Sequence, residues 1–192
     1  MSAISSGTFN IARSGSLRTS IERLLEGVGE AGVRPLERRL AEGFFRRSDD
    51  VYLLQRRLDT ILAQWSDLYR WAEVRAPREI KVRVLNPTEG ENGYGLQRTV
   101  IQTCMEDQPF IFDTLVNLLA TTGLKNPRCI HPILGVVRDE AGRISKINPL
   151  PQASEGNESM MHFEIPRVEE PERRAEIQRM VLSRLRKVQA MV

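Results

Sequence analysis

Three features of the sequence predict an α+β protein. Short stretches with strand-like alternation or β-branched residues recur from residue 79 onward. Two longer stretches between and after them carry apolar residues every three or four positions, which predicts helices. A run of helical periodicity also precedes the first strand. Together these features predict a ferredoxin-like antiparallel sheet with two covering helices, preceded by an N-terminal helical segment.

The composition is that of a soluble globular protein, with 41% hydrophobic and 28% charged residues among 192. There is no apolar run of about 18 residues and no signal-peptide core, so we expect a cytoplasmic protein that does not bind membranes. The 28 basic residues are interleaved with 25 acidic ones. This mixture is typical of solvated helix faces, so we expect no nucleic-acid partner. Cys104 and Cys129 lack metal-ligand spacing, and we expect two reduced thiols.

The N-terminal part divides into a tail, residues 1–15, and a helical segment, residues 16–76. The tail is rich in Ser and Gly, and we expect it to be disordered or loosely attached. Helices are predicted at 16–31, at 35–46 and, without interruption, at 51–72. The apolar stripe of the first comprises Leu17, Ile21, Leu24, Leu25 and Val28. The stripe of the third comprises Val51, Leu54, Leu58, Ile61, Leu62, Trp65, Leu68, Tyr69 and Ala72.

Residues 77–192 are predicted to form the sheet domain. The expected strands are 79–86, 99–104, 129–138, a short one at 143–147, and 160–168, and the expected helices are 107–123 and 170–190. From residue 99 this order is β-α-β-β-α, a ferredoxin-like unit without its last strand. A hairpin loop joins the 79–86 strand to the central one, so that strand can fill the missing place. The two helices then cover one face, and the N-terminal helices cover the other or extend outward. Pro132 suggests an edge position or a bulge.

The turn after the central strand is a candidate binding site. Asp107 or Gln108 is predicted to cap the next helix, with Pro109 in its first turn. The free N–H groups of Phe110 and Ile111, at the positive end of the helix dipole, would attract a carboxylate. An amino group could bind Asp107 and Asp113. We therefore expect any amino-acid effector to contact Asp107, Gln108, Pro109, Phe110, Ile111 and Asp113. In the alternative interpretation, Asp107 and Pro109 only end a strand and begin a helix.

Several blocks of sequence occur in a recognisable order. These are VRVLNP, TVIQTCMEDQPFIFDTLVNLL, IHPILGVVRDEAGRI and ESMMHFEI. With this order and spacing, residues 75–168 resemble the N-terminal region of the large bacterial NAD-specific glutamate dehydrogenases, which contains the first of several ACT-like domains. The resemblance implies an ACT-like fold within an enzyme that oxidatively deaminates glutamate to 2-oxoglutarate with NAD. The catalytic domain of that family lies far C-terminal of this region, so the chain is either a fragment or a short stand-alone relative.

The resemblance leaves two functional hypotheses. The first is a non-catalytic regulatory or assembly module, whose partners are further copies of itself or the remainder of a dehydrogenase chain. The second is a stand-alone sensor that binds an amino acid at a dimer interface. The turn resembles the ACT effector loop, typically Asp-x-Pro-Gly, with Phe110 in place of the glycine, where it crowds the backbone. No dinucleotide fingerprint follows a strand, so we expect no catalytic residue and no cofactor.

Two other classes of function are less well supported by the residues. An RNA-binding sheet needs exposed aromatic side chains on its two middle strands, and only Phe163 offers one. An enzyme would depend on His131 or His162, without a nucleophile beside either. Glu158, His162 and Glu164 could form a metal site with His131, but the spacing is a weak indication, and we expect no metal.

Overall fold

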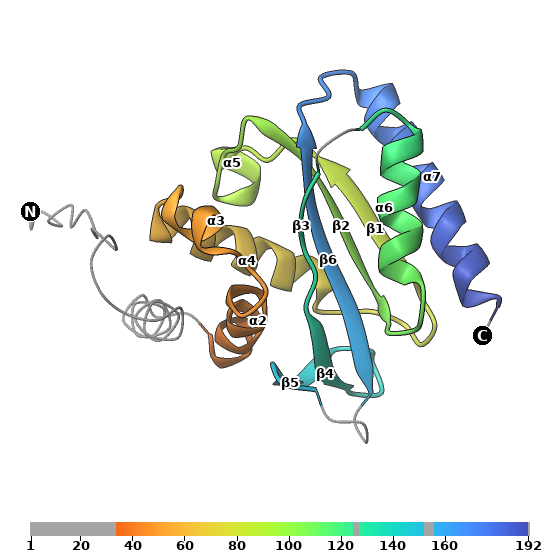
Figure 1. Ribbon diagram of the computed structural model, residues 1–192. Helices are drawn as coiled ribbons and strands as arrows, with labels where there is room; N and C mark the ends of the chain where they lie inside the picture. The colour runs from red at the N-terminus through yellow and green to blue at the C-terminus, as the bar shows by residue number, and fades with distance from the viewer. Residues whose placement is uncertain (1–33, 125–126, 152–155, 192) are drawn as a thin grey trace, which may run out of the picture.

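The computed structural model describes residues 34–124, 127–151 and 156–191 (Figure 1). One antiparallel sheet contains the strands β1 Lys81–Leu85, β2 Arg98–Glu106, β3 Arg128–Ile130, β4 Ile133–Arg138, β5 Ile144–Asn148 and β6 Asn157–Pro166. Their order is β1-β2-β6-β4-β5, with β3 also paired to β6. β1 lies antiparallel beside β2, in the place predicted for the missing ferredoxin strand. The α+β, ferredoxin-like class is therefore confirmed.

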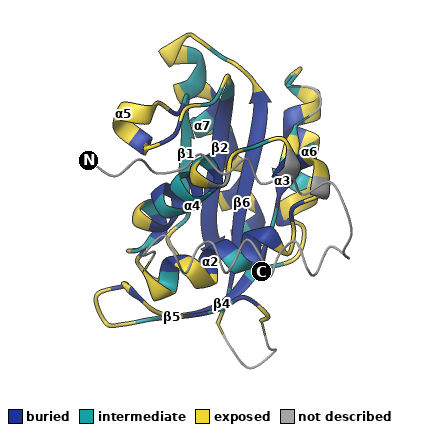
Figure 2. Cartoon of the chain, turned by 90° about the vertical axis from the view of Figure 1, so that its left-hand side faces the viewer, coloured by how far each residue is buried: buried dark blue, intermediate teal, exposed yellow. Residues whose placement is uncertain are grey.

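Helices cover both faces of this sheet (Figures 1 and 2). The helices are α2 Pro35–Phe45, α3 Asp50–Leu54, α4 Leu58–Ala72, α5 Glu89–Asn92, α6 Ile111–Thr121 and α7 Pro171–Gln189. α6 and α7 pack on one face, where the core includes Ile101, Met161 and Phe163. α2, α3 and α4 pack on the other face, where it includes Cys104 and Met160. Alternate side chains of β2 and β6 therefore enter different cores.

The helices α2, α3 and α4 cover the face of the sheet opposite α6 and α7. This is one of the two positions that the sequence analysis allowed for them. The predicted tail and the helix at 16–31 lie outside the described residues. α4 and the sheet share one core, while the proposed division between 16–76 and 77–192 stays a prediction. Among the described residues, no helix combines the length and apolar character that crossing a membrane requires.

The prediction of one continuous helix over 51–72 is wrong. The chain leaves the helical path at 55–57, so α3 and α4 are separate helices. The break lets Arg56 reach a buried carboxylate, Glu164, on β6. Within α4 the predicted stripe is confirmed, because Ile61, Trp65, Leu68, Tyr69 and Ala72 are buried. Val51 is instead exposed, and the side chains of Leu54 and Leu58 lie outside the described ones.

The predicted strand at 129–138 is interrupted at residues 131–132. Pro132 has no N–H to donate, so β3 and β4 are separate strands. Both pair with β6 in one register, since Ile130 lies opposite His162 and Ile133 opposite Ser159. Pro132 therefore causes no bulge; the irregularity lies further on, between Val137 and Arg138.

The two cysteines are free thiols on strands that flank β6, as predicted. Cys104 is buried on the face covered by α2 to α4, whereas Cys129 packs on the other face. Burial raises the pKa of each thiol to about 12, and for Cys104 the nearby Glu158 adds to this effect. Both thiols are therefore protonated and weakly reactive at neutral pH.

At Gly43, α2 lies close against the sheet. A Cβ at this position would lie 2.4 Å from Cδ2 of Leu134, which is fully buried. We predict that Gly43→Ala lowers the free energy of unfolding by about 1–2 kcal/mol, because overpacking exceeds the gain in helix propensity. Urea unfolding would measure this. Gly90→Ala in α5 is the control, since a Cβ there meets nothing within 4 Å. Equal midpoints for the two variants would contradict the close packing.

Candidate functional site

The turn between β2 and α6 has a different geometry from the predicted one. Phe110, not Asp107 or Gln108, is the N-cap residue, and no side chain caps the helix. Pro109 precedes the helix instead of occupying its first turn. The reason is the left-handed backbone of Phe110, with φ of 69° and ψ of 0°, because of which the helix begins only at Ile111. The first helical hydrogen bond runs from the Thr114 N–H to the Phe110 carbonyl, at 3.0 Å.

This geometry leaves the N-terminal N–H groups of α6, from Phe110 to Asp113, without partners within the helix. They include the two N–H groups predicted to attract a carboxylate. The helix is 11 residues long, so its dipole adds positive potential at the same end. The carboxylate of Asp107 accepts the backbone N–H of Gln108, not one from the helix. Burial raises the pKa of Asp107, and the bond from Gln108 opposes that rise.

The turn is tied to the sheet at Asn157, the first residue of β6. The Asp107 N–H donates to the Asn157 carbonyl at 2.8 Å. Two buried polar atoms nearby, Nε2 of Gln108 and Oδ1 of Asn157, have no hydrogen-bond partner among the described residues. A buried donor or acceptor without a partner is costly and calls for an explanation such as a ligand. The sequence pattern drew attention to Gln108 but gave no indication of Asn157.

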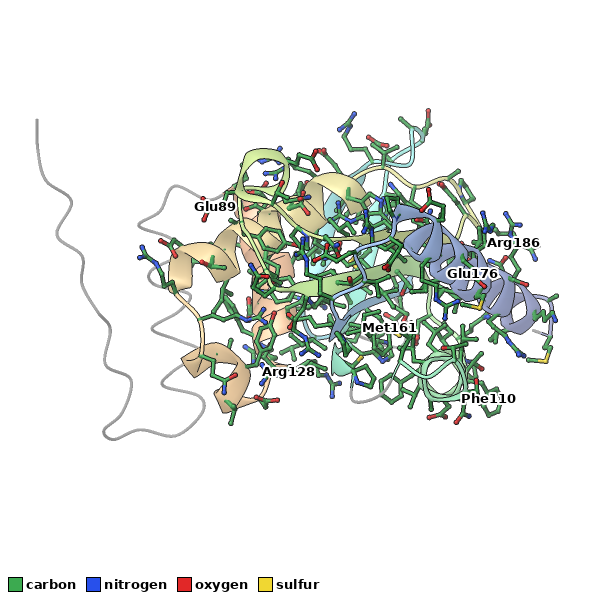
Figure 3. The ribbon with its side chains drawn as sticks, turned by 90° about the horizontal axis from the view of Figure 1, so that it is seen from above. Glu89, Phe110, Arg128, Met161, Glu176 and Arg186 are labelled. Carbon is green, nitrogen blue, oxygen red and sulfur yellow. The ribbon has the colours of Figure 1, made fainter. Side chains whose placement is uncertain are left out.

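The other residues predicted to contact an effector differ in how far they are buried. Ile111 is buried in the core below α6, and Pro109 and Asp113 are exposed. Phe110 is 68% exposed and lies at the periphery of the molecule, beside α6 (Figure 3). A left-handed conformation costs a residue with a Cβ about 1–2 kcal/mol relative to glycine. Phe110 thus adopts the backbone conformation of the glycine that it replaces in the loop pattern.

A second group of polar residues lies between the sheet and the α3–α4 helices. Its centre is Glu164, fully buried on β6. Arg56 donates to both carboxylate oxygens, at 2.7 and 2.6 Å. The Tyr52 hydroxyl also donates to Glu164, at 3.1 Å, and itself accepts from Arg56 and Gln64. Burial would raise the pKa of Glu164, but hydrogen bonds from His162 and Arg56 outweigh burial and hold it well below its usual range.

A chain of hydrogen bonds fixes the orientation of His162. Arg83 donates to Asp67 at 2.7 Å and, through Nε, to Oε1 of Gln102 at 2.6 Å. The Nε2 of Gln102 therefore faces Nδ1 of His162, at 3.0 Å, and donates to it. The proton of His162 is then on Nε2, which lies 3.1 Å from Glu164. Burial lowers the pKa of His162 and outweighs the bond to Glu164, so the imidazole is neutral.

Glu158 forms a similar arrangement at the other end of β6. Arg75 donates to it at 2.8 Å, and Arg138 binds both of its oxygens at 2.7 and 2.8 Å. Burial would raise the pKa of Glu158, but the bonds from Arg138 and Arg75 prevail and lower it. Arg138 also donates to backbone carbonyls after α4, including that of Glu73. The arginine partners lie far from Glu158 in sequence, and no local pattern indicated them.

The four residues weighed as a metal site do not come together. Glu158 and Glu164 are occupied by arginines, while His131 lies on the opposite face and contacts Ser159 at 2.8 Å. The ring of His131 stacks on Phe112 of α6, with centroids 5.5 Å apart. Burial lowers the pKa of His131 to about 4, and Arg47 adds to this effect. No group of metal-ligand residues occurs elsewhere in the described chain.

The middle strands, β2 and β6, offer no open face for nucleic acid. α6 and α7 cover one side of them and α3 and α4 the other, and Phe163 is fully buried. The stacking platform that RNA recognition requires is therefore missing from the described part of the sheet.

The order of strands, the two helices on one face and the turn after the central strand define an ACT-like domain of the ferredoxin-like class. Comparison with known proteins gives the same class. The profile of the family described as glutamate dehydrogenase, ACT1 domain, matches residues 40–181. The chain belongs to this family, and corresponds to the N-terminal ACT-like region of NAD-specific glutamate dehydrogenases.

Two relatives carry the name NAD-specific glutamate dehydrogenase. The protein from Halomonas elongata is 30% identical over 142 residues, which are 73% of this chain and 9% of the relative. The protein from Pseudomonas aeruginosa is 30% identical over 131 residues, which are 66% of this chain and 8% of the relative. The chain thus spans less than a tenth of the length of these relatives. No solved structure matches the chain significantly.

Removal of Arg56 should destabilise the protein strongly. We predict that Arg56→Met lowers the free energy of unfolding by about 3 kcal/mol, because Glu164 would remain buried without its cation. The neighbouring Arg57→Met is the control. Arg57 pairs with Asp59 on the surface, where its side chain is 81% exposed, and its loss should not change the urea midpoint. Equal effects of the two substitutions would show that the Glu164 pair is not a structural requirement.

The two histidines should make the protein less stable in weak acid. Their pKa values are lowered by folding, so below pH ~6.5 the unfolded chain binds more protons than the native state. The free energy of unfolding should therefore fall between pH 7 and pH 5, by up to about 2 kcal/mol for His131, whose pKa is about 4, and His162 should add a loss in the same direction. NMR titration would show His131 neutral down to pH 5 and His162 with a pKa below its usual value. Protonation of His162 near pH 6.5 in the native state would contradict the orientation derived above.

Proposed function

We propose that this chain is a non-catalytic regulatory module of an NAD-specific glutamate dehydrogenase, and that the module responds to a free amino acid bound at residues 107–113. Membership of the ACT1 family and the names of the two relatives support the first part. The parent enzyme would oxidatively deaminate glutamate to 2-oxoglutarate. The module would act through contacts with the remainder of a dehydrogenase chain or with a second copy of itself.

The observation that carries the effector site is the uncapped start of α6. Four backbone N–H groups and the helix dipole converge there, and they favour a carboxylate. Asp107 and Asp113 supply negative charge for an ammonium group. The unpartnered amide of Gln108 and the carbonyl oxygen of the Asn157 side chain provide one donor and one acceptor at the base of the turn. An α-amino acid has both of the charged groups that this arrangement would recognise.

Phe110 would control access to these N–H groups. Its backbone already has the left-handed conformation of a glycine, and its side chain is largely in solvent. A strained residue in a binding loop is a common feature of sites that close on a ligand. We expect the ring to hinder a close approach to the backbone, so that the affinity for an effector is modest.

The absence of catalysis in this module is a further part of the proposal. Both glutamates of β6 and His162 are buried and held by hydrogen bonds on the side of α3 and α4. A general acid or base must reach its substrate within hydrogen-bond distance. Side chains engaged in this way stabilise a fold and do not meet that requirement.

Calorimetric titration with a panel of free amino acids tests the site. We predict that at least one amino acid binds, and that Asp113→Asn weakens its binding about tenfold or more, because the ammonium group loses a charged partner. Phe110→Gly should bind more tightly, since it opens the backbone without changing its conformation. The control is Glu140→Gln, which changes an exposed acidic residue in another turn.

Two results would count against the proposal. Binding that is unchanged in Asp113→Asn would place the ligand elsewhere on the chain. A panel in which no amino acid binds would leave the turn as a structural element, and the module as a surface for assembly.

A further inference from the structure

α7 is the longest of the described helices, with 19 residues, and one of its sides faces solvent. Its buried side consists of Ile177, Val181, Leu185 and Val188. The helix lies at the periphery of the molecule, away from α2 to α5 (Figures 1 and 3). The proposed amino-acid site at 107–113 does not use its solvent side.

Six exposed residues form a stripe along the solvent side of α7. They follow one another at intervals of four and three positions, which keeps them on one face of a helix. This α7 stripe comprises Glu172, Glu176, Arg179, Ser183, Arg186 and Ala190. Its charges are negative in the first half and positive in the second half.

The helix dipole explains only part of this order of charges. Acidic residues in the first turn and basic residues in the last turn stabilise a helix, and the effect falls off within one turn. Glu172 and Arg186 fit this explanation. Glu176 and Arg179 lie in the middle of the helix, yet they continue the same order. The distribution therefore indicates more than stabilisation of the helix ends.

The positive half of the α7 stripe has no ion-pair partner within the described residues. The sequence contains no acidic residue after Glu176, and Arg179 and Arg186 form no ion pair in the described chain. Elsewhere on the surface, Arg46 pairs with a nearby glutamate on α2. In the negative half, Glu176 binds Arg173 at 2.6 Å through one carboxylate oxygen, Oε2. The stripe thus presents unpaired positive charge and a carboxylate that can accept a second cation.

The α7 stripe is complementary to itself when it is reversed. Glu176 and Arg186 lie at equal distances from residue 181, as do Arg179 and Ser183. Around a two-fold axis at residue 181, two antiparallel copies of the stripe would place each Glu176 opposite an Arg186. Each Arg179 would face a serine, so that no like charges meet. An interface with two-fold symmetry requires such a self-complementary surface, and this is the commonest symmetry of soluble oligomers.

We propose that the α7 stripe is an interface between two copies of this chain. The two α7 helices pack antiparallel, and Glu176 of each protomer pairs with Arg186 of the other. The contact is about 28 Å long and mainly polar, so the association is weak and sensitive to salt. The proposal rests on the part of the proposed function in which the module contacts a second copy of itself. Binding of an amino acid at 107–113 is independent of it.

Sedimentation equilibrium of the full chain, up to a concentration of about 1 mM, tests this interface. We expect a monomer–dimer equilibrium whose association constant falls about tenfold between ionic strengths of about 0.01 and 1 M. Arg186→Glu should lower the association constant about tenfold or more at low salt, because two pairs of carboxylates would then face each other. The double variant Glu176→Arg, Arg186→Glu should restore it, since the charges are exchanged and the pairing is kept.

The matched control is Arg184→Glu, which makes the same change of charge at an exposed residue of α7 outside the stripe. It should change the association constant less than about twofold. Circular dichroism and urea midpoints should match the parent for all variants, because the three positions are exposed. A chain that stays monomeric at about 1 mM, equal losses in Arg184→Glu and Arg186→Glu, or no recovery in the double variant would each overturn the proposal. A dimer that persists when no amino acid binds at 107–113 would support this interface and count only against the effector site.

Discussion

The two buried carboxylates of β6 are the constraint on which the rest of the structure depends. Glu158 and Glu164 lie on the face of the central strand that the α2–α4 helices cover, and each needs a cation to remain ionised there. One cation for each carboxylate comes from outside the ferredoxin-like unit, because Arg56 precedes α4 and Arg75 follows it, while Arg138 of β4 also binds Glu158. The two ends of α4 are thereby attached to the two ends of β6. Displacing the helices would separate Glu164 from Arg56 and Glu158 from Arg75, so the sheet and its helical layer form one cooperative structure.

The buried ion pairs determine which position the helices take on the sheet more than they add to the free energy of unfolding. A buried ion pair contributes little net energy compared with a well-packed apolar pair, but removing one partner is costly. The pairs therefore select one position of the helices over others in which apolar contacts would be similar. The orientation of Gln102 and His162 depends on the same network, since Arg83 holds the amide and Glu164 accepts the imidazole N–H. On the face covered by α6 and α7, the described core residues are apolar.

The sequence predicts the fold because the spacing of apolar residues indicates which face of a strand or helix packs against a core. The alternation in β1 and the stripes of α6 and α7 each identify the face that packs against a core, without knowledge of distant residues. This pattern fails to predict the break between α3 and α4 at 55–57, because the apolar spacing continues there. The partner of the break, Glu164, is more than a hundred residues away. The sequence also places the cap of α6 incorrectly. Asp107 and Pro109 fit a cap by residue type, but the left-handed backbone of Phe110 cannot be recognised from a pattern that normally has glycine. The sequence groups Glu158, His162 and Glu164 only as a weak metal site with His131, and no local pattern predicts their arginine partners.

The proposed effector turn and the buried ion pairs meet at the start of β6. Asn157 holds the turn through the Asp107 N–H, and the next residue, Glu158, is held by Arg75 and Arg138. A ligand that bonded to the side chains of Gln108 and Asn157 would act on a backbone segment one peptide away from this pair. Through Arg75 and Arg138 the same carboxylate binds the chain that leaves α4. The turn on one face of the sheet and the helical layer on the other therefore have a common attachment, and an effector could alter the outer surface of the module through it without unfolding either core.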